Sequence, residues 1–495
     1  MKIILAEVIL GLLLMMPSCG KDSGSSGGET GTNPVDTTTV KSVTLYLTTA
    51  NRTAELNKGT VALKTGSAAS ATNRILLEPS TTYQTMDGFG AAVTGSTAYN
   101  LLRMSSDNRT KFLKQTFSDS EGYGFSYIRV AIGCSDFSLS EYTCCDAPGI
   151  ENFALTNEEK NYVIPVLKEI LTINPNVKII ATPWTAPRWM KVTSSGGTTS
   201  YNSWTGGHVA TQYYPDYATY FVKWIQAFQD QGIPIYAVTP QNEPLNSGNS
   251  ASTLMTWQEE QAFIRDALGP QIQTAGLGTK IYAYDHNYDE YTYPLNIYKD
   301  ADAAKYITGA AFHNYGGSKS ALLNVHSGRE DKGLIFTEAS IGQWNDGRNL
   351  NARLMDDMSD VALGTVNNWC TAVLVWNLML NTDMGPNRNG GCQSCYGSVD
   401  ISTSDYATIT KNSFYFIIAH LAAVVKPNAK RIATFDGSAL SGIISSAFIN
   451  TDGSLAVVLL NNNASSKTVT ITDGANYFNY SCPAKSVVSF RWAKA

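Results

Sequence analysis

Two glutamates stand at the ends of strand-like apolar runs. Glu243 follows the run 235–238 within Thr-Pro-Gln-Asn-Glu-Pro, and Glu338 follows the run 334–336 within Phe-Thr-Glu-Ala-Ser. Carboxylates at the ends of parallel strands can face each other across the mouth of a barrel. Such a pair can cleave a glycosidic bond. A single strand-end glutamate is usually solvated or salt-bridged, so the hypothesis depends on the pair and its surroundings.

The other predicted strands also end in polar or aromatic residues. These residues are Arg129 and Asp136, Trp184, Asn242, His313 and Tyr315, Trp344, and Trp376 with Asn377. Each has an ordinary structural interpretation, because a tryptophan can fill a core and an arginine can form a structural ion pair. Packing alone does not readily explain so many of them at one mouth, which favours a sugar site with indole faces and hydrogen-bonding groups.

Alternating strand-like and helix-like segments would position these residues. The strand candidates are 85–93, 125–133, 177–183, 235–240, 280–284, 307–312, 333–336 and 372–378. Amphipathic segments with helical spacing lie between them, for example at 158–171, 217–229, 257–268 and 353–368. The pattern predicts an α/β fold with a (β/α)8 TIM barrel over residues 83–429. An open doubly wound sheet is the alternative, but Gly88-Phe-Gly90 lacks the GxGxxG pattern of its phosphate loop.

The two flanks of the barrel read as β-structure. Residues 40–82 are rich in Thr, Val and Leu without a long helical pattern. After a last helix at 413–425, residues 430–495 form short strand-like runs separated by turn signals such as Asn450-Thr-Asp-Gly453. Neither flank alone can form a stable sandwich. We therefore predict one β-sandwich built from both chain ends, 40–82 and 430–495, and packed against the barrel.

The N-terminus is typical of an export signal. Lys2 precedes an apolar run, 3–16, which is too short for a comfortable membrane span. Ser18-Cys19 resembles a bacterial lipobox, so we predict a lipoprotein signal peptide over 1–18 and lipidation of Cys19. A plain secretory signal with an incidental cysteine is the alternative.

A segment rich in Gly, Ser and Thr follows the signal. We predict that residues 19–39 form a flexible tether, because they contain almost no large apolar residue. The chain is expected as an exported bacterial lipoprotein at the outer-membrane surface or in the periplasm. Its membrane contact would be the lipid anchor at Cys19 alone.

Composition limits the remaining classes. The 495 residues suffice for a barrel plus a second domain, and the net charge of -5 argues against a nucleic-acid partner. Besides Cys19 the chain has an odd number of cysteines, so at least one is unpaired. Cys392-x-x-Cys395 lacks a second CxxC or a histidine pair, which favours a small loop disulfide or free thiols over a metal site. We predict a monomer without metal or cofactor.

The chain resembles glycoside hydrolase family 30, which contains lysosomal-type glucosylceramidases and microbial β-1,6-glucanases. The resemblance extends from about residue 83 to the C-terminus. Its motifs are Gln84-Thr-Met-Asp-Gly-Phe-Gly90, Tyr127-Ile-Arg129-Val, Ser135-Asp136-Phe-Ser138, Thr182-Pro-Trp184-Thr-Ala-Pro-Arg-Trp189, Asn242-Glu243-Pro244, Phe312-His-Asn-Tyr315, Thr337-Glu338-Ala and Trp376-Asn377-Leu. The sandwich made from both chain ends is also similar to this family.

The resemblance implies a retaining mechanism with Glu243 as acid/base and Glu338 as nucleophile. The substrate-binding residues would be Asp136, Trp184, Asn242, His313, Tyr315, Trp344 and Trp376, with Arg129 in support. Arg129 and Tyr315 would keep Glu338 ionised. Glu243 must start protonated, and we expect the negative charge of Glu338 to raise its pKa until Glu338 is esterified.

Departures from the lysosomal-type pattern lie around the mouth. They are Val375 in place of an aspartate, Thr94-Gly95 in place of Thr-Asp, and the loop 387–396 with its two cysteines. The expected function is therefore an endo-β-1,6-glucanase acting on fungal-type glucan. A glucosylceramidase or β-glucosidase is the alternative, and a β-1,4-xylanase is a further one. A non-catalytic glycan-binding lipoprotein is a remote alternative.

Overall fold

The computed structural model describes residues 41–436 and 440–494. The predicted signal peptide (1–18), the tether (19–39) and the lipidation site at Cys19 lie outside the described residues. Among the helices of the described part, none combines the length and apolar character needed to cross a bilayer.

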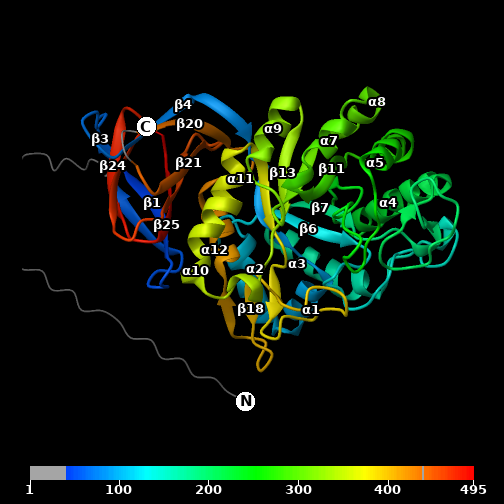
Figure 1. Ribbon diagram of the computed structural model, residues 1–495. Helices are drawn as coiled ribbons and strands as arrows, with labels where there is room; N and C mark the ends of the chain where they lie inside the picture. Colours follow the sequence, from blue (N-terminus) through cyan, green and yellow to red (C-terminus); the bar gives the residue numbers. More distant parts are fainter. Residues whose placement is uncertain (1–40, 437–439, 495) are drawn as a thin grey trace, which may run out of the picture. The chain divides into compact units, whose positions relative to one another are not determined.

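Eight parallel strands close into a barrel, as predicted (Figure 1). In their order around the barrel they are β10 (Ala237–Val238), β11 (Lys280–Asn287), β12 (Ile307–His313), β13 (Gly333–Glu338), β15 (Cys370–Val375), β5 (Gly88–Ala92), β6 (Tyr127–Ile132) and β7 (Lys178–Pro183). All eight match the predicted apolar runs, although β10 is shorter and β11 longer than predicted.

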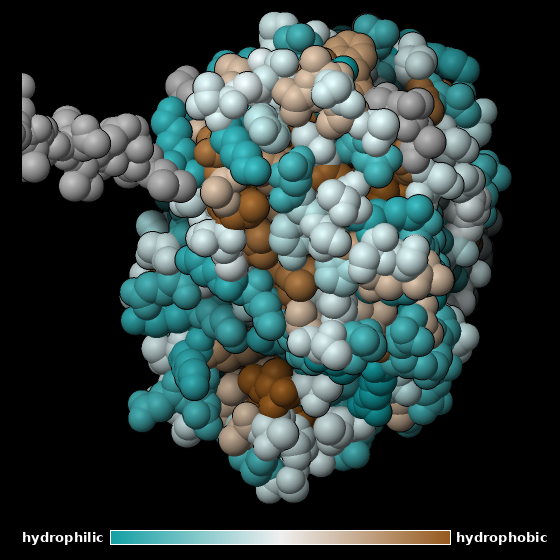
Figure 2. All heavy atoms as spheres, turned by 90° about the vertical axis from the view of Figure 1, so that its left-hand side faces the viewer, coloured by the Kyte–Doolittle hydropathy of each residue, from teal (hydrophilic) through white to brown (hydrophobic). Residues whose placement is uncertain are grey.

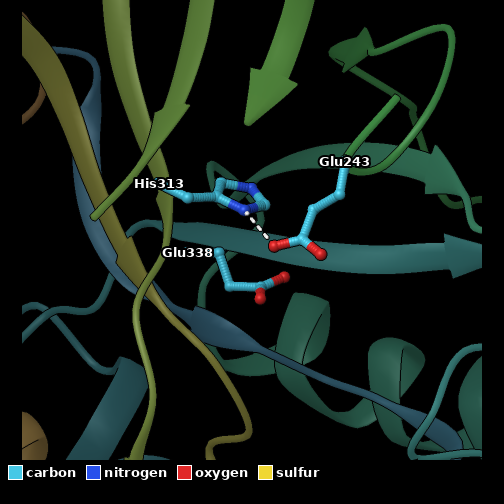
Figure 3. Close-up of side chains that lie close together, drawn as sticks. All are labelled: Glu243, His313 and Glu338. Atoms are coloured by element: carbon cyan, nitrogen blue, oxygen red, sulfur yellow. Dashed lines mark hydrogen bonds and ion pairs between the residues drawn. The ribbon is translucent and has the colours of Figure 1, made fainter. Parts of the chain in front are cut away.

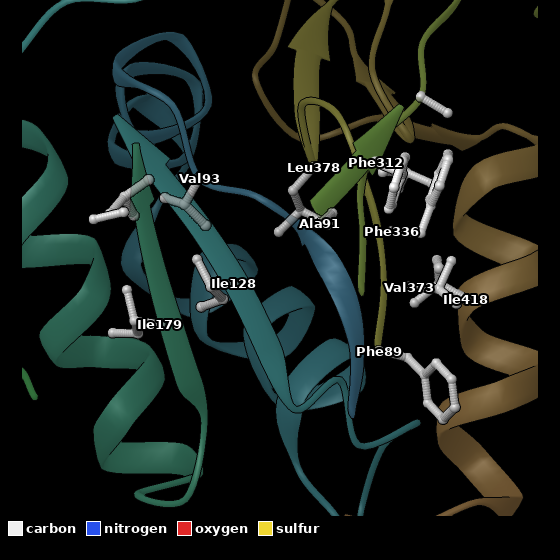
Figure 4. Packing of buried hydrophobic residues seen from close by; sticks show 14 of the residues in the cluster. Phe89, Ala91, Val93, Ile128, Ile179, Phe312, Phe336, Val373, Leu378 and Ile418 are labelled. Atoms are coloured by element: carbon white, nitrogen blue, oxygen red, sulfur yellow. The ribbon is translucent and has the colours of Figure 1, made fainter. Parts of the chain in front are cut away.

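Side chains of the barrel strands alternate between its interior and the surrounding helices. In β6, Ile128 and Val130 belong to the outer core, whereas Tyr127 belongs to the small inner cluster. Arg129 therefore points into the barrel. Figure 4 shows the outer layer, where Phe89 and Val373 lie near Ile418 of α12 (Ser413–Val424).

Helices surround the barrel. They are α1 (Gly95–Arg103), α2 (Ser106–Phe117), α3 (Ile164–Ile173), α4 (Tyr214–Gln229), α5 (Trp257–Phe263), α6 (Gly269–Thr274), α7 (Thr292–Ile297), α8 (Ala301–Ala304), α9 (Ala321–Gly328), α10 (Leu350–Asp357) and α11 (Leu363–Asn367). Three predicted helices contain π-helical turns, at η2 (Glu159–Val163), η5 (Ile264–Leu268) and η8 (Met358–Ala362). These turns leave the amphipathic pattern intact, so the sequence does not reveal them.

The loops at the mouth contain further short elements. The strands are β8 (Lys191–Val192), β9 (His208–Val209), β14 (Ile341–Gly342), β16 (Met379–Asn381), β17 (Cys395–Tyr396), β18 (Val399–Ile401) and β19 (Ile409–Lys411), and the 3-10 turns are η1 (Ile150–Asn152), η3 (Arg188–Met190), η4 (Thr211–Tyr213), η6 (Tyr288–Glu290) and η7 (Gln343–Asn345). Antiparallel pairing joins β8 to β9 and β14 to β17.

Both flanks contribute to one sandwich, as predicted. Its hydrogen-bonded order is β2 (Asn57–Ala62), β1 (Ser42–Thr49), β25 (Ser486–Trp492), β22 (Leu455–Asn461), β21 (Ile443–Ile449), β20 (Lys430–Asp436), β4 (Arg74–Thr85), β23 (Lys467–Thr472), β24 (Asn476–Cys482) and β3 (Lys64–Thr65). A separate core lies inside it, with Val43 and Ile75 from the N-terminal flank beside Val457 and Phe490 from the C-terminal flank.

Helix α12 joins the sandwich to the barrel. Every residue of α12 is buried, and its His420 contacts Ser489 of β25 and Thr48 of β1 through its two ring nitrogens. The sandwich surface is mostly hydrophilic, with narrow hydrophobic patches (Figure 2). Its largest exposed apolar side chain is Phe435 of β20, which is 58% exposed.

Candidate active site

The two predicted glutamates face each other across the barrel mouth (Figure 3). Glu243 lies in the loop after β10, Glu338 ends β13, and His313 ends β12 between them. One side-chain oxygen of each glutamate and a ring nitrogen of His313 all lie within 4.8 Å of one another. Both glutamates are only 6% exposed. Oxygens this close are compatible with the spacing of a retaining pair, whose carboxyl groups lie about 5–5.5 Å apart.

Backbone hydrogen bonds hold Glu243 in place. Asn242 donates its N–H to the Pro183 carbonyl at 2.9 Å, and Glu243 donates its own to the Asp285 carbonyl at 3.0 Å. Glu243 has a φ of 45°, in the left-handed region that non-glycine residues rarely adopt. Such strain concentrates at functional sites, where the surrounding structure maintains it.

Two donors hold the carboxylate of Glu338. Arg129 forms a buried ion pair with its Oε2, and the Tyr315 hydroxyl donates to its Oε1 at 2.9 Å. Arg129 is fully buried and also donates to Oδ1 of Asn242 at 2.6 Å. These two donors fix the orientation of the carboxylate and place a positive charge beside it. The structure thus places Arg129 and Tyr315 where the sequence-based hypothesis needs them.

Histidine 313 sets the charge of Glu243. Its Nδ1 lies 3.2 Å from Oε1 of Glu243, while Asn246 and Asn249 donate to Oε2 at 2.8 and 3.4 Å. Burial favours a neutral Glu243, but the hydrogen bond and positive charge of His313 outweigh it and lower the pKa of Glu243 to about 2. We expected the charge of Glu338 to raise this pKa, and that expectation is wrong in direction for the free protein.

The surroundings of His313 favour a proton on its ring instead. Burial opposes a charged imidazole, but the charge of Glu338 and the hydrogen bonds that the ring donates to Asp285 and Glu243 outweigh it and raise the pKa of His313 to about 9. Glu338 therefore raises the proton affinity of the Glu243–His313 pair, although the proton lies on the imidazole. The pair holds one proton at neutral pH.

Asp285 is a functional residue that the sequence analysis missed. It is fully buried in β11 and accepts hydrogen bonds from five side chains, which are Arg129 at 2.8 Å, Thr182 at 3.2 Å, Thr239 at 2.7 Å, His313 at 3.1 Å and Thr337 at 2.5 Å. Burial alone would raise its pKa, but Arg129 and His313 hold the pKa well below its usual range. Asp285 thus orients both the partner of Glu338 and the partner of Glu243.

A β-bulge turns Asp285 inward. The pairing register of β11 with β12 shifts between Tyr284 and His286, and both Tyr284 and Asp285 have positive φ. Bulges of this kind re-aim side chains next to active sites. The sequence does show an aspartate directly after the apolar run at 281–284, and that signal could have identified the residue.

Two indoles and an aspartate surround the carboxylates. Trp184 and Trp376 stack with ring centroids 5.0 Å apart, and the Arg129 guanidinium lies 4.9 Å from the first ring and 5.4 Å from the second. Oδ1 of Asp136 is buried without a hydrogen-bond partner among the described residues. Burial, reinforced by Glu338 and Glu243, raises the pKa of Asp136 to about 8. An unpartnered buried carboxyl oxygen suits a sugar hydroxyl.

Trp344 is separate from this cluster. It lies in η7, after β14, and is 55% exposed. It forms no aromatic pair with another ring in the described part of the chain. The structure therefore brings together all the predicted site residues except Trp344, which lies further out on the loop that follows Glu338.

Glu243, His313 and Glu338 are also the residues that could hold a metal ion. Both nitrogens of His313, however, already contact carboxylates, Nδ1 with Glu243 and Nε2 with Asp285. A metal would have to displace the proton that these acids hold on the ring. The group fits two-carboxylate hydrolysis better.

Comparison with known proteins identifies the family. The description "Glycosyl hydrolase family 30 TIM-barrel domain" matches residues 86–425, and "Glycosyl hydrolase family 30 beta sandwich domain" matches residues 428–490. The chain belongs to glycosyl hydrolase family 30. It is therefore a glycosidase with the retaining mechanism of this family, as the spacing of its carboxylates indicates.

Three relatives of this family 30 glycosidase have names that state an activity. A solved structure of the endo-beta1,6-glucanase BT3312 has 60% sequence identity and a TM-score of 0.89, covering 92% of this chain and 99% of that chain. The endo-1,6-beta-D-glucanase neg1 of Aspergillus fumigatus is 31% identical over 82% of this chain and 85% of its own length. The lysosomal acid glucosylceramidase of Mus musculus is 27% identical over 90% of this chain and 88% of its own.

Proposed function

We propose that this glycosidase is an endo-β-1,6-glucanase. The single observation that carries the proposal is the likeness to BT3312, at 60% identity over nearly the whole of both chains. Fungal relatives described as endo-1,6-β-glucanases, from Aspergillus fumigatus and Trichoderma harzianum, support the same linkage at 31% and 32% identity. The substrate would be a β-1,6-linked glucan of the fungal type.

Glu338 is the proposed nucleophile. Its carboxylate attacks the anomeric carbon and forms a glycosyl-enzyme ester while the leaving group departs on the opposite side. Arg129 and Tyr315 hold the carboxylate in a fixed orientation. Asp136 and the stacked indoles Trp184 and Trp376 would bind the sugar, Asp136 through its hydroxyls and the indoles through its apolar face.

Glu243 is the proposed acid/base, and His313 supplies its proton. A proton that moves from Nδ1 of His313 to Glu243 converts the carboxylate into the acid that protonates the leaving oxygen. Esterification removes the charge of Glu338, which lowers the proton affinity of the pair, so Glu243 stays ionised and acts as base on water. When the ester is cleaved, the charge of Glu338 returns and the pair regains its proton.

The outer-membrane or periplasmic location remains part of this proposal. Its support is the N-terminal sequence, with an apolar run before Ser18-Cys19. Retention of tritiated palmitate by the wild-type chain, and its loss in Cys19→Ala, is the expected result. Equal labelling of both would overturn the lipid anchor.

Product analysis on pustulan, a β-1,6-glucan, tests the function. We expect oligosaccharides of several lengths early in the reaction, because an endo-acting enzyme cuts within the chain, and little release from β-1,3-glucan, β-1,4-glucan or xylan. Glucose as the sole early product would exclude endo action. Turnover of glucosylceramide without turnover of pustulan would replace the proposal by the glucosylceramidase alternative.

Two variants test the assigned residues. Glu338→Gln and Glu243→Gln should each lower kcat on pustulan by about a thousandfold or more, because each removes a group that acts in the transition state. Glu121→Gln is the matched control, since its carboxylate is 66% exposed and far from the barrel mouth. Wild-type turnover in either site variant would exclude the assigned role.

A further inference from the structure

One loop contacts three other loops at the barrel mouth, those that follow β6, β10 and β13. We call residues 385–396, which follow β16 and include β17, the strap. Its Arg388 is 7% exposed and donates from Nε to the Ser135 carbonyl at 2.9 Å and from Nη2 to the Ser250 carbonyl at 2.7 Å. It also lies 3.1 Å from Glu141. One guanidinium thus joins the loop after β6 to the loop after β10.

Two glycines let the strap lie directly against these loops. A Cβ on Gly391 would lie 2.7 Å from the Asp136 carbonyl oxygen and 3.0 Å from its Cβ. A Cβ on Gly390, whose φ is 84°, would lie 3.1 Å from Cβ of Ser250. The strap backbone therefore lies so close to Asp136 and Ser250 that a side chain at either glycine would crowd them.

The other end of the strap contacts the loop after β13. Cys392 and Cys395 form a disulfide, and β17, which contains Cys395, pairs with β14. Gln343, next to Trp344, donates its N–H to the Ser394 carbonyl at 2.9 Å. Cys395 also packs in one apolar cluster with the site indoles Trp184 and Trp376.

Two residues that the strap holds lie beside residues of the site, and a third lies beside Trp344 on the outer loop. Ser135 precedes Asp136, Ser250 follows Asn249, which donates to Glu243, and Gln343 precedes Trp344. We propose that the strap, anchored by Arg388 and closed by the Cys392–Cys395 disulfide, positions the sugar-binding wall and so sets the affinity for the glucosyl unit. The proposal rests on the glycosidase activity of this site, and it holds for any β-glucoside that the enzyme cleaves.

A general stabilising role does not explain the disulfide as well. It joins cysteines three positions apart, and so short a loop removes little conformational entropy from the unfolded chain. Its effect is therefore local. Arg388 likewise bonds backbone carbonyls of two mouth loops, and backbone atoms transmit position more directly than the tips of mobile side chains.

Removal of the disulfide is the first test. Cys392→Ser/Cys395→Ser, and wild type treated with dithiothreitol, should both raise KM for an aryl β-glucoside by about tenfold while kcat changes by less than about threefold and Tm by a few degrees. The double variant treated with dithiothreitol is the control, because it has no Cys392–Cys395 disulfide and its KM should not change on treatment. The other five cysteines of the described residues are free thiols, so no other described disulfide responds.

Unchanged KM in the double variant would overturn the proposal, as would a loss of kcat that simply follows a loss of folded protein. A wild type that cleaves the aryl glucoside but not pustulan would refute the proposed linkage and leave the test of the strap intact.

Substitution of Arg388 is the second test. Arg388→Met should raise KM as the disulfide variant does, because both carbonyl contacts are lost. Arg388→Lys should recover part of the affinity, because one ammonium can reach one of the two carbonyls but lacks the planar fork. Equal KM values in Arg388→Met, Arg388→Lys and wild type would contradict a positioning role for Arg388. If Arg388→Met does not fold, the Lys variant and the dithiothreitol titration still decide.

Discussion

Histidine 313 couples the two glutamates at the scale of single residues. It contacts Glu243 directly, and Asp285 on its other side also binds Arg129, the partner of Glu338. The charge of Glu338 raises the pKa of His313 without a hydrogen bond between them, so the proposed esterification of Glu338 would lower the proton affinity of the histidine. This coupling would let one pair of groups act first as acid and then as base.

A histidine variant tests this coupling through the pH profile. The pKa of His313 is raised to about 9, so the wild-type pair keeps its proton below that pH and loses it above. We expect kcat/KM to fall as the pH rises through about 9. In His313→Gln only Glu243 can hold the proton, so this alkaline limb should move to lower pH and kcat should fall about a hundredfold. Initial rates on an aryl β-glucoside measure both, and an unmoved limb would contradict the coupling.

Asp285→Asn tests the central acceptor. The substitution removes the charge that Arg129 and His313 share, and its NH2 group faces donors. We expect kcat to fall, the alkaline limb to move to lower pH, and the free energy of unfolding to drop by about 3–5 kcal/mol, as when a buried ion pair loses one partner. Urea unfolding and the pH profile measure these effects.

Asp87→Asn is the matched control for Asp285→Asn. Asp87 pairs with Lys178 at the opposite end of the barrel, just before β5. Its loss should lower stability but leave the pH profile unchanged. If both variants shift the profile equally, Asp285 has no special role.

At the scale of elements, the close pairing of β5 and β6 depends on a glycine. Gly90 pairs with Tyr127, and a Cβ on Gly90 would lie 1.7 Å from the Tyr127 carbonyl oxygen. Gly90→Ala must therefore push the two strands apart, and we expect Tm to fall sharply with a loss of about 3 kcal/mol or more. Gly278→Ala is the control, because its Cβ would meet no atom within 4 Å. Equal Tm values in both variants would contradict this packing.

The strands were predictable from the sequence, and the irregular backbone was not. The apolar run 125–133 identifies a barrel strand, and the polar Arg129 near its end indicates a residue of the mouth. The bulge at Asp285 and the left-handed Glu243 depend on tertiary hydrogen bonds, to which local patterns do not respond. The pKa of Glu243 was mispredicted for the same reason, since the proximity of His313 arises from the pairing of distant strands. The sequence marks the loop 387–396 as a departure from the lysosomal-type pattern, but the contacts of the strap with three other loops depend on the fold.

At the scale of the whole molecule, His420 lies where barrel and sandwich meet. The Ser489 hydroxyl donates to the His420 carbonyl at 2.8 Å, so Nδ1 of the ring must donate to the Ser489 oxygen. Nε2 then accepts from the Thr48 hydroxyl at 2.9 Å. A neutral imidazole thus forms hydrogen bonds with strands from both ends of the chain, β1 and β25. Because all three residues are fully buried, protonation of the ring has no compensating partner.

This neutral histidine should make the described part of the chain sensitive to acid. Burial lowers the pKa of His420 to about 3, against 6.5 in an exposed ring. Between these pH values the unfolded chain binds one more proton than the native protein, so stability falls as pH falls. The slope from one proton is about 1.4 kcal/mol per pH unit. His420→Gln, which cannot titrate, should show a shallower dependence in urea unfolding. Ser489→Ala removes the contact but keeps the titrating ring, so it should be less stable at every pH with the wild-type slope. Parallel curves for wild type and His420→Gln would show that the imidazole does not control acid unfolding at this junction.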